Sequence, residues 1–228
     1  MEEAGVIPLL EERETVEQQV ERTLRRLIVT GRLTEGTPLV HRDLAQRLGV
    51  SPTPVRVSLA QLEREGLVEV GATGRAVVSR LTREDFEEIY AARSGLEGLA
   101  ARVGAAALDR DELAEMRRHL TTLRRLAREQ DVDAYLETRW AFYGTCYRAS
   151  GRRRLVDAVE RLFVRSERYN RLVLSTAERL AESVARYAEF LAACEARDGA
   201  AAERAVQGSI RWAVDRVAPT LPSETDGA

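Results

Sequence analysis

Apolar positions recur at helical spacing along most of the chain, and the first such stretch lies near the N-terminus. Its apolar face consists of Val16, Val20, Leu24, Leu27 and Ile28. Thr30-Gly31 follows, and a glycine at this position commonly ends a helix. The spacing predicts a helix over about 14–30, with residues 1–13 forming a disordered tail before it.

A helix-turn-helix is predicted shortly afterwards. The segment 41–48 has the length of a short helix and is followed by Gly49. Ser51 is a favourable N-cap residue, and Pro52 occupies the first position of a further helix. The apolar face of that helix consists of Val55, Leu59 and Leu62. Two short helices joined by 49–51 give a helix-turn-helix.

Two short strands are predicted after Gly66. Residues 67–70 and 76–78 are rich in β-branched side chains, and the turn between them contains Gly71 and Gly74. The pair forms a β-wing beside the helix-turn-helix. Residues 14–80 are therefore predicted to form a winged helix-turn-helix domain.

The rest of the chain is predicted to be helical. Thr82 is an N-cap candidate, and the apolar stripe after it includes Phe86, Ile89, Tyr90 and Leu96. Six antiparallel helices with short connections, one of them over 152–173, make a bundle over 81–218. The expected fold is mainly α, with this bundle after the winged helix-turn-helix and a disordered tail over 219–228.

Composition excludes a membrane protein and a secreted disulfide scaffold. The 228 residues are 44% hydrophobic and 32% charged, and uncharged runs such as 141–147 are far too short to cross a bilayer. Acidic residues stand where a secretory signal has basic ones, and the two cysteines, Cys146 and Cys194, form no closely spaced pair. These features favour a cytoplasmic protein with reduced thiols.

Charge is distributed unevenly, although the net charge of the chain is only −2. Residues 22–80 hold ten arginines and five acidic residues, whereas residues 81–228 hold 24 arginines and 25 acidic residues. A basic module joined to a nearly neutral one indicates that the first part meets a polyanion and the second part has another task.

Two motifs in residues 44–68 resemble the GntR family of bacterial transcription regulators. They read Leu44-Ala45-Gln-Arg-Leu-Gly49-Val50-Ser51-Pro-Thr53-Pro54-Val55-Arg56 and Leu62-Glu-Arg-Glu-Gly66-Leu67-Val68. The helical part, with Arg93-Ser-Gly-Leu-Glu97 and Tyr147-Arg-Ala-Ser-Gly151, resembles the effector-binding FCD-type domain of the FadR-like branch. The resemblance extends over about 14–217. It implies a homodimer that binds a palindromic DNA operator and responds to a small molecule held among the helices.

Residues at the start of the second helix of the motif are candidates for contact with DNA. The N-terminal end of a recognition helix reaches base edges in the major groove, and arginine can bond a guanine or a phosphate. Ser51, Thr53 and Arg56 lie at that end. The resemblance adds Arg42 and Gly74, with the glycine allowing the wing backbone to enter the minor groove. The alternative is that Arg42 and Arg56 are ordinary solvated helix residues.

The helical domain departs from its relatives at the positions where many of them hold a divalent metal. Those four positions are Arg139, Tyr143, Tyr187 and Ser209 in this chain. A guanidinium, two phenols and an alcohol are poor metal ligands, and the histidines lie elsewhere in the sequence. We therefore expect no metal and no other cofactor.

An arginine on an apolar face needs an anion, and Arg139 lies on such a face with Tyr143. The anion is either an internal carboxylate such as Glu97 or a carboxylate or phosphate of a bound ligand. Arg93 and Arg165 also need an anion, which could again be internal or part of a ligand. For Arg93 the internal candidate is Glu97, at i,i+4 on the same helix. The candidate effector-binding residues are Arg93, Arg139, Tyr143, Arg165, Tyr187 and Ser209. The alternative for Tyr143 and Tyr187 is that they are ordinary core residues, which is the more common role of tyrosines on such a face.

Three classes of function were compared. The leading hypothesis is a DNA-binding transcription regulator, expected to be a repressor, whose operator binding is modulated by a small anionic metabolite such as a carboxylic acid. An enzyme is not expected, because no nucleophile, phosphate loop or metal cluster accompanies the acidic pairs. The remaining alternative is a DNA-binding protein that needs no effector and uses its helical domain only for dimerisation.

Overall fold

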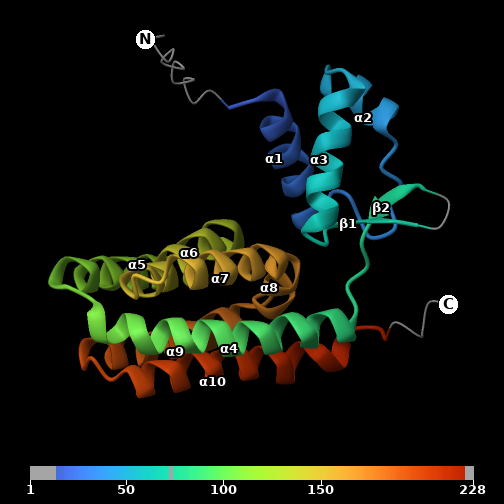
Figure 1. Ribbon diagram of the computed structural model, residues 1–228. Helices are drawn as coiled ribbons and strands as arrows, with labels where there is room; N and C mark the ends of the chain where they lie inside the picture. The colour runs from blue at the N-terminus through green and yellow to red at the C-terminus, as the bar shows by residue number, and fades with distance from the viewer. Residues whose placement is uncertain (1–13, 72–73, 224–228) are drawn as a thin grey trace, which may run out of the picture. The chain divides into compact units, whose positions relative to one another are not determined.

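The computed structural model describes residues 14–71 and 74–223, and the chain divides after Ser79 into two compact units. Helices make up most of both units, and a two-stranded sheet lies in the first (Figure 1). The prediction of a mainly α fold with a winged helix-turn-helix and a helical bundle is confirmed. Within the described residues, no helix is both long and apolar enough to span a membrane.

The N-terminal unit consists of three helices followed by a hairpin. These are α1 (Val16–Val29), α2 (His41–Leu48), α3 (Pro52–Arg64), β1 (Val68–Val70) and β2 (Ala76–Val78). The strands are antiparallel, with Val68 opposite Val78. Leu24, Val55 and Leu62 are fully buried in a core that belongs to this unit alone.

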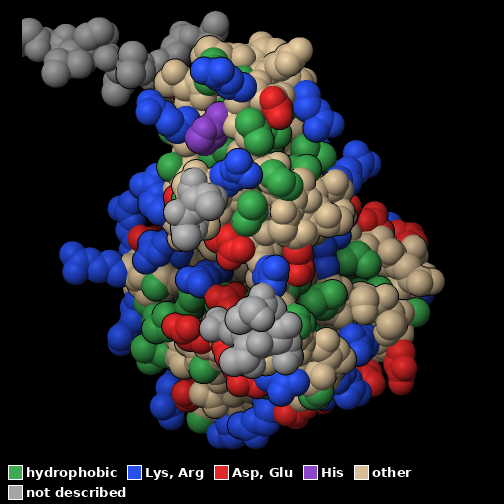
Figure 2. Space-filling view, turned by 90° about the vertical axis from the view of Figure 1, so that its right-hand side faces the viewer, with side chains coloured by type: hydrophobic (Ala, Val, Ile, Leu, Met, Phe, Trp, Pro, Cys, Tyr) green, Lys and Arg blue, Asp and Glu red, His purple; other side chains and the backbone are tan. Residues whose placement is uncertain are grey.

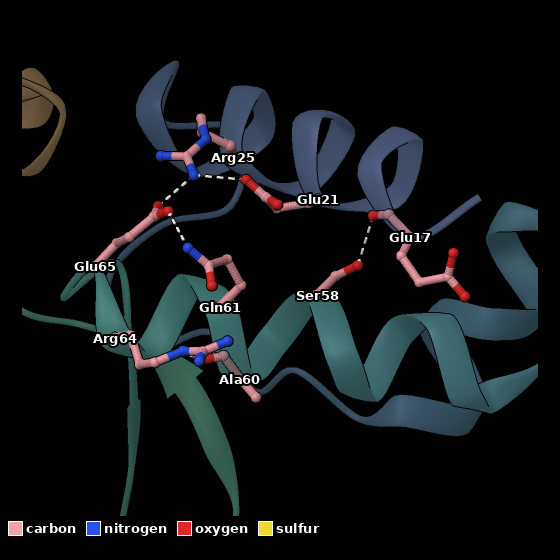
Figure 3. A network of polar contacts seen from close by, with 8 residues as sticks. All are labelled: Glu17, Glu21, Arg25, Ser58, Ala60, Gln61, Arg64 and Glu65. Carbon is pink, nitrogen blue, oxygen red and sulfur yellow. Dashed lines mark hydrogen bonds and ion pairs between the residues drawn. The ribbon is translucent and has the colours of Figure 1, made fainter. Parts of the chain in front are cut away.

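Polar contacts fix α3 against α1 (Figure 3). The Ser58 hydroxyl donates to the carbonyl oxygen of Glu17 at 2.8 Å. The Arg25 guanidinium bonds Glu21 on its own helix and Glu65 just after α3. Because these contacts and the apolar core occupy the back of α3, the position of its opposite, exposed face is set by the fold.

The second unit is a bundle of helices whose members pack along one another. They are α4 (Arg83–Ala107), α5 (Arg110–Glu129), α6 (Val132–Ala149), α7 (Arg153–Arg165), α8 (Glu167–Val173), α9 (Ala177–Glu195) and α10 (Gly199–Val217). Helix α4 lies alongside α10 (Figure 1). At Gly104 a Cβ atom would lie 2.0 Å from the carbonyl oxygen of Cys146, so only glycine permits this approach of α4 to α6.

Two expectations for this unit are corrected. The predicted helix over 152–173 is interrupted at Ser166, which separates α7 from α8. The tail is ordered through its first half, because 218–220 form a 3-10 turn and Leu221 is buried. The carbonyl oxygen of Pro222 also accepts a hydrogen bond from the backbone N–H of Arg83. The tail predicted over 1–13 lies outside the described residues, as does 224–228, the second half of the tail predicted over 219–228.

Candidate nucleic-acid interface and ligand cavity

The turn between α2 and α3 presents the start of α3 to solvent. Gly49 ends α2 with φ +68°, a left-handed conformation that suits glycine. Pro52 begins α3 as predicted, but the side chain of Ser51 makes no capping hydrogen bond. Ser51 is thus the N-cap residue, as predicted, but its exposed side chain does not cap the backbone of α3.

The predicted DNA-contact residues of the helix-turn-helix are all exposed. Ser51, Thr53 and Arg56 gather at the N-terminal end of α3, and Arg42 lies in the first turn of α2. Neither arginine forms an ion pair with a described residue. Figure 2 shows basic side chains spread over the surface of the N-terminal unit, with few acidic ones on the side that it draws.

The wing is a short hairpin with a glycine at its turn. Gly74 is exposed, has φ +71° and donates its backbone N–H to the carbonyl oxygen of Gly71 at 2.8 Å. Apart from Gly74 itself and its two chain neighbours, no atom of the described residues lies within 4 Å of the position that a Cβ would occupy at Gly74. The neighbouring residues 72–73 lie outside the described part.

The helical unit contains a cavity of about 20 Å³ that brings together most of the predicted effector residues. Its wall includes Arg93, Arg139, Tyr187, Ser209, Tyr90, Asn170 and a set of apolar side chains from α8 and α10. Tyr143 lies just behind this wall, with its ring centroid 5.3 Å from that of Tyr187. The four positions that the family resemblance links to a metal site, Arg139, Tyr143, Tyr187 and Ser209, therefore lie near one another.

Arg165 does not belong to this group. It ends α7, its side chain is 44% exposed, and its Nη2 lies 2.9 Å from Oδ1 of Asp85 in the first turn of α4. The placement of Arg165 in the effector pocket is corrected accordingly. Its anion is an internal carboxylate at the start of α4.

Arg93 has the internal partner that was left open as an alternative. Its Nε lies 2.6 Å from Oε1 of Glu97, and both side chains are almost completely buried. The Tyr147 hydroxyl donates to Oε2 of the same carboxylate at 2.9 Å. Arg93 also donates from Nη1 to Asn170 at 3.4 Å, while its Nη2 is buried without a hydrogen-bond partner.

Arg139 has no such partner. Its side chain makes no hydrogen bond to a described residue, and its buried Nη1 is unsatisfied. The guanidinium lies over the ring of Phe163, with 4.6 Å from Cζ to the centroid. Burial would lower its pKa, but the oxygens of Tyr187, Tyr143 and Glu97 raise the pKa above the usual arginine value. The core therefore holds a cation that lies against aromatic rings and near these oxygens, without a carboxylate hydrogen-bonded to it.

Some cavity residues were not singled out as ligand contacts from the sequence. The Tyr90 hydroxyl donates to Oδ1 of Asn170 at 2.9 Å, which fixes the asparagine at the cavity wall. Tyr90 precedes Arg93 by one helical turn, so its spacing was a usable signal. Asn170 gave no such signal, because it lies in α8 and the position of α8 depends on the break at Ser166. Trp212 gave none either, because a tryptophan on an apolar helix face is usually a packing residue.

The side chains gathered here do not suit a divalent cation. Arg139 is permanently positive, and burial raises the pKa of the Tyr143 hydroxyl, so this phenol stays protonated. No cluster of three or more His, Cys, Asp or Glu residues lies within the described part of the chain. Phenols and an alcohol beside a guanidinium are a poor ligand set for a divalent metal.

Comparison with known proteins identifies the family. Residues 16–78 match the bacterial regulatory proteins of the gntR family, and residues 88–211 match the FCD domain. This chain belongs to the GntR family of transcription regulators and carries an FCD domain. The regulator is thus a DNA-binding protein and not an enzyme, since the matched domains and relatives are transcription regulators.

Individual relatives agree with this assignment. The regulator is 29% identical to the HTH-type transcriptional regulator McbR of Escherichia coli K12, over 79% of this chain and 82% of McbR. It is 24% identical to the transcriptional repressor RspR of the same organism, over 84% of each chain. The solved structure of E. coli McbR superposes with a TM-score of 0.73 at 25% identity, covering 86% of this chain and 94% of McbR.

Proposed function

We propose that this regulator is a cytoplasmic homodimer that represses transcription from a palindromic operator, and that a small anion in the helical domain changes its affinity for that operator without a metal. The single observation that carries the effector part is Arg139, a buried guanidinium at a cavity wall whose Nη1 has no hydrogen-bond partner among the described residues. Burial of an unpaired charge lowers the free energy of unfolding, and a bound anion would offset this cost.

The DNA part rests on the exposed start of α3. Ser51, Thr53 and Arg56 lie together there, and neither Arg56 nor Arg42 is engaged by a described residue. Free guanidinium groups at this place can bond base edges or phosphates. A homodimer would carry two such helices, and its two-fold symmetry would match a palindromic site.

The alternative, a helical domain that only dimerises, is less well supported. Dimerisation needs a rigid apolar core, and replacing an unsatisfied buried arginine by an apolar residue would make such a core more stable. Arg93 and Arg139 instead both present an unsatisfied nitrogen in this region. Two unsatisfied cationic donors at one cavity favour a site for an anion.

Selection of duplexes from a random DNA library by the full-length protein tests this proposal. We expect recovery of a two-fold symmetric site that is bound in a salt-sensitive manner. Titration of that site is then repeated with a panel of small organic anions, with and without EDTA. We expect at least one anion to shift the midpoint, equally in both conditions. Recovery of no preferred sequence would contradict the DNA part, and a midpoint that no anion moves would favour the dimerisation-only alternative.

A further inference from the structure

We propose that Val57 on α3 contacts the 5-methyl group of a thymine in each half of the operator, and so selects thymine over cytosine at that base pair. This inference rests on the proposed function in one respect, namely that the exposed face of α3 enters the major groove of a two-fold symmetric operator. It goes further by naming a residue that reads a base and the chemical group that it reads. Three observations carry it: the exposure of Val57, its place on α3, and the absence of acidic side chains around it.

Val57 is an apolar side chain that the fold leaves in solvent. It is 47% exposed, whereas Val55 and Leu59 on the same helix are buried. Valine is also a poorer helix former than alanine or leucine, because its branched Cβ restricts the side chain in a helix. Neither the core of the N-terminal unit nor the helix propensity of α3 therefore accounts for a valine at this position.

Val57 lies in the middle of the exposed face of α3. Residues 53, 57 and 60 are separated by four and three positions, so they lie along one line of the helix surface, and all three are exposed. Figure 3 shows Ser58 on the side of α3 that faces α1, and Ala60 on the other side. The outer side of α3 thus presents the methyl groups of Thr53, Val57 and Ala60 in a row, with Arg56 beside them.

This row of methyl groups matches a feature of the major groove. Helix α3 is the second helix of the helix-turn-helix, and in this motif the second helix presents its exposed face to the base edges. Thymine carries a methyl group at C5 in this groove, whereas cytosine has a hydrogen there and an amino donor beside it at N4. Contact with an apolar side chain removes the thymine methyl group from water. Ala60, one turn after Val57, is small enough to leave room for the base edge.

The charges of α3 favour thymine over cytosine beside Val57. The first turn of α3 holds no acidic residue, and none occurs in this helix before Glu63. A carboxylate at this place would accept a hydrogen bond from N4 of cytosine and would be repelled by the phosphates. The Val57 side chain forms no hydrogen bonds, so contact with a methyl group is the base-specific interaction open to it.

A contact with another protein is the alternative use of an exposed valine. Val16 and Val70 in the same unit are also 47% exposed, and single exposed apolar residues are common on protein surfaces. These two lie at the start of α1 and in β1, and not on the second helix of the helix-turn-helix. Val57 differs from them by its place between Thr53 and Ala60 on α3, so a protein contact at Val57 would contradict the proposal.

Operator titrations with the full-length protein test the methyl contact. The probe is the symmetric duplex selected from the random library. Each of its thymines is replaced in turn, in both half-sites, by deoxyuridine, which pairs in the same way but lacks the methyl group. At one position we expect this change to weaken binding about tenfold, as the loss of one methyl contact in each half-site would do. Cytosine at that position should bind at least as weakly, and 5-methylcytosine should bind more tightly than cytosine because it restores the methyl group.

Val57→Ala links this effect to the residue. The variant should bind the thymine duplex about tenfold more weakly, and deoxyuridine at the critical position should then cost it less than about twofold. Because alanine is the better helix former, the variant should melt no lower than the unaltered protein. Val16→Ala is the matched control, since Val16 is equally exposed but lies at the start of α1. It should keep both the affinity and the sensitivity to deoxyuridine.

The outcomes separate this inference from the function on which it rests. An operator whose thymines all tolerate deoxyuridine, or a deoxyuridine penalty that persists undiminished in Val57→Ala, would overturn the methyl contact. Unchanged operator affinity in Val57→Ala would overturn it too, and a changed sedimentation coefficient would assign Val57 to a protein contact instead. Each of these results leaves the operator, and with it the proposed function, in place. Recovery of no symmetric operator from the library would contradict the proposed function and this inference together.

Discussion

Two arginines on neighbouring helices of the same core differ in how their charge is compensated. Arg93 is bonded to Glu97, whereas Arg139 lies over aromatic rings, has an unsatisfied nitrogen and is hydrogen-bonded to no carboxylate of the described residues. Removing one member of a buried ion pair leaves a buried charge behind, while removing an unpaired buried charge leaves none. The same substitution should therefore have opposite effects on stability at the two positions.

Arg139→Met should raise the free energy of unfolding of the ligand-free protein by roughly 1–4 kcal/mol, because it replaces an unpaired buried cation by an apolar side chain of similar length. Arg93→Met should lower it by roughly 3–5 kcal/mol, because it leaves the Glu97 carboxylate buried with only Tyr147 as a donor. Denaturant unfolding measures both. A loss of stability in Arg139→Met would show that the guanidinium is compensated in the folded protein.

Arg56 carries the corresponding prediction for DNA. Arg56→Ala should cost about 1–3 kcal/mol of operator binding if the side chain reads a base, or lower the salt slope by about one if it bonds a phosphate. Arg64→Ala is the control, because Arg64 lies in the last turn of the same helix and bonds a carbonyl oxygen of that helix. Equal affinity and equal slope for Arg56→Ala and the unaltered protein would remove Arg56 from the interface.

The sequence pattern predicts that a side chain points inward, but it predicts its partner only where one partner alone is within reach. The apolar stripe placed Arg139 inward, and the i,i+4 spacing offered Glu97 to Arg93, but the spacing could not decide which arginine took the carboxylate. Arg165 was misplaced because it also follows apolar residues. Its helix ends at that residue, so its side chain reaches Asp85 instead of the core.

At the scale of elements, α8 is the part that the sequence did not predict. Apolar residues continue at helical spacing through 152–173, and Ser166 is compatible with a helix interior. Local contacts accompany the break: the Ser166 hydroxyl donates to the carbonyl oxygen of Phe163, three residues earlier, and accepts from the side chain of Asn170, four residues later. No glycine or proline marks this break in the sequence, whereas the hairpin, α2 and α3 were predictable because glycine and proline mark their ends.

Helix α8 contacts both the cavity and the beginning of α4. Asn170 lines the cavity. Its neighbour Tyr169 donates its hydroxyl to Oδ2 of Asp85 at 2.9 Å and accepts from the backbone N–H of Thr82 at 3.2 Å. Thr82 follows directly on the connection from the DNA-binding unit. A ligand that moves α8 would therefore disturb the first turn of α4.

Tyr169→Phe should leave the affinity for the anion within about twofold while reducing the change in operator affinity that the anion causes. The substitution removes the hydroxyl that reaches Thr82 and Asp85 but keeps the ring against Phe86. Calorimetry gives the anion affinity, and operator titrations with and without the anion give the response. Tyr135→Phe, which removes a buried hydroxyl bonded to Ser183, is the matched control and should keep the full response. An unaltered response in Tyr169→Phe would exclude this route.

At the scale of the whole molecule, the uneven charge and the two cores describe the same division. The basic segment 22–80 largely coincides with the first compact unit. The buried hydrophobic residues form two clusters that share no residue, one in each unit. Composition could locate this division because it changes where the DNA-binding surface ends. It gave no information about the ordered 219–223 segment, which is held by the contact between Pro222 and Arg83.

Residues 80–228 should accordingly fold without the first unit. This fragment retains its own core and the complete cavity wall, so we expect a cooperative thermal transition, a helical dimer by sedimentation, and anion affinity close to that of the full chain. It should not bind the operator, because its 25 arginines are balanced by 25 acidic residues and it lacks α3. Gel-shift titration at low salt measures the last point. Sequence-selective retention of DNA by the fragment would mean that recognition extends beyond the helix-turn-helix, and loss of anion binding would mean that the first unit helps to form the cavity.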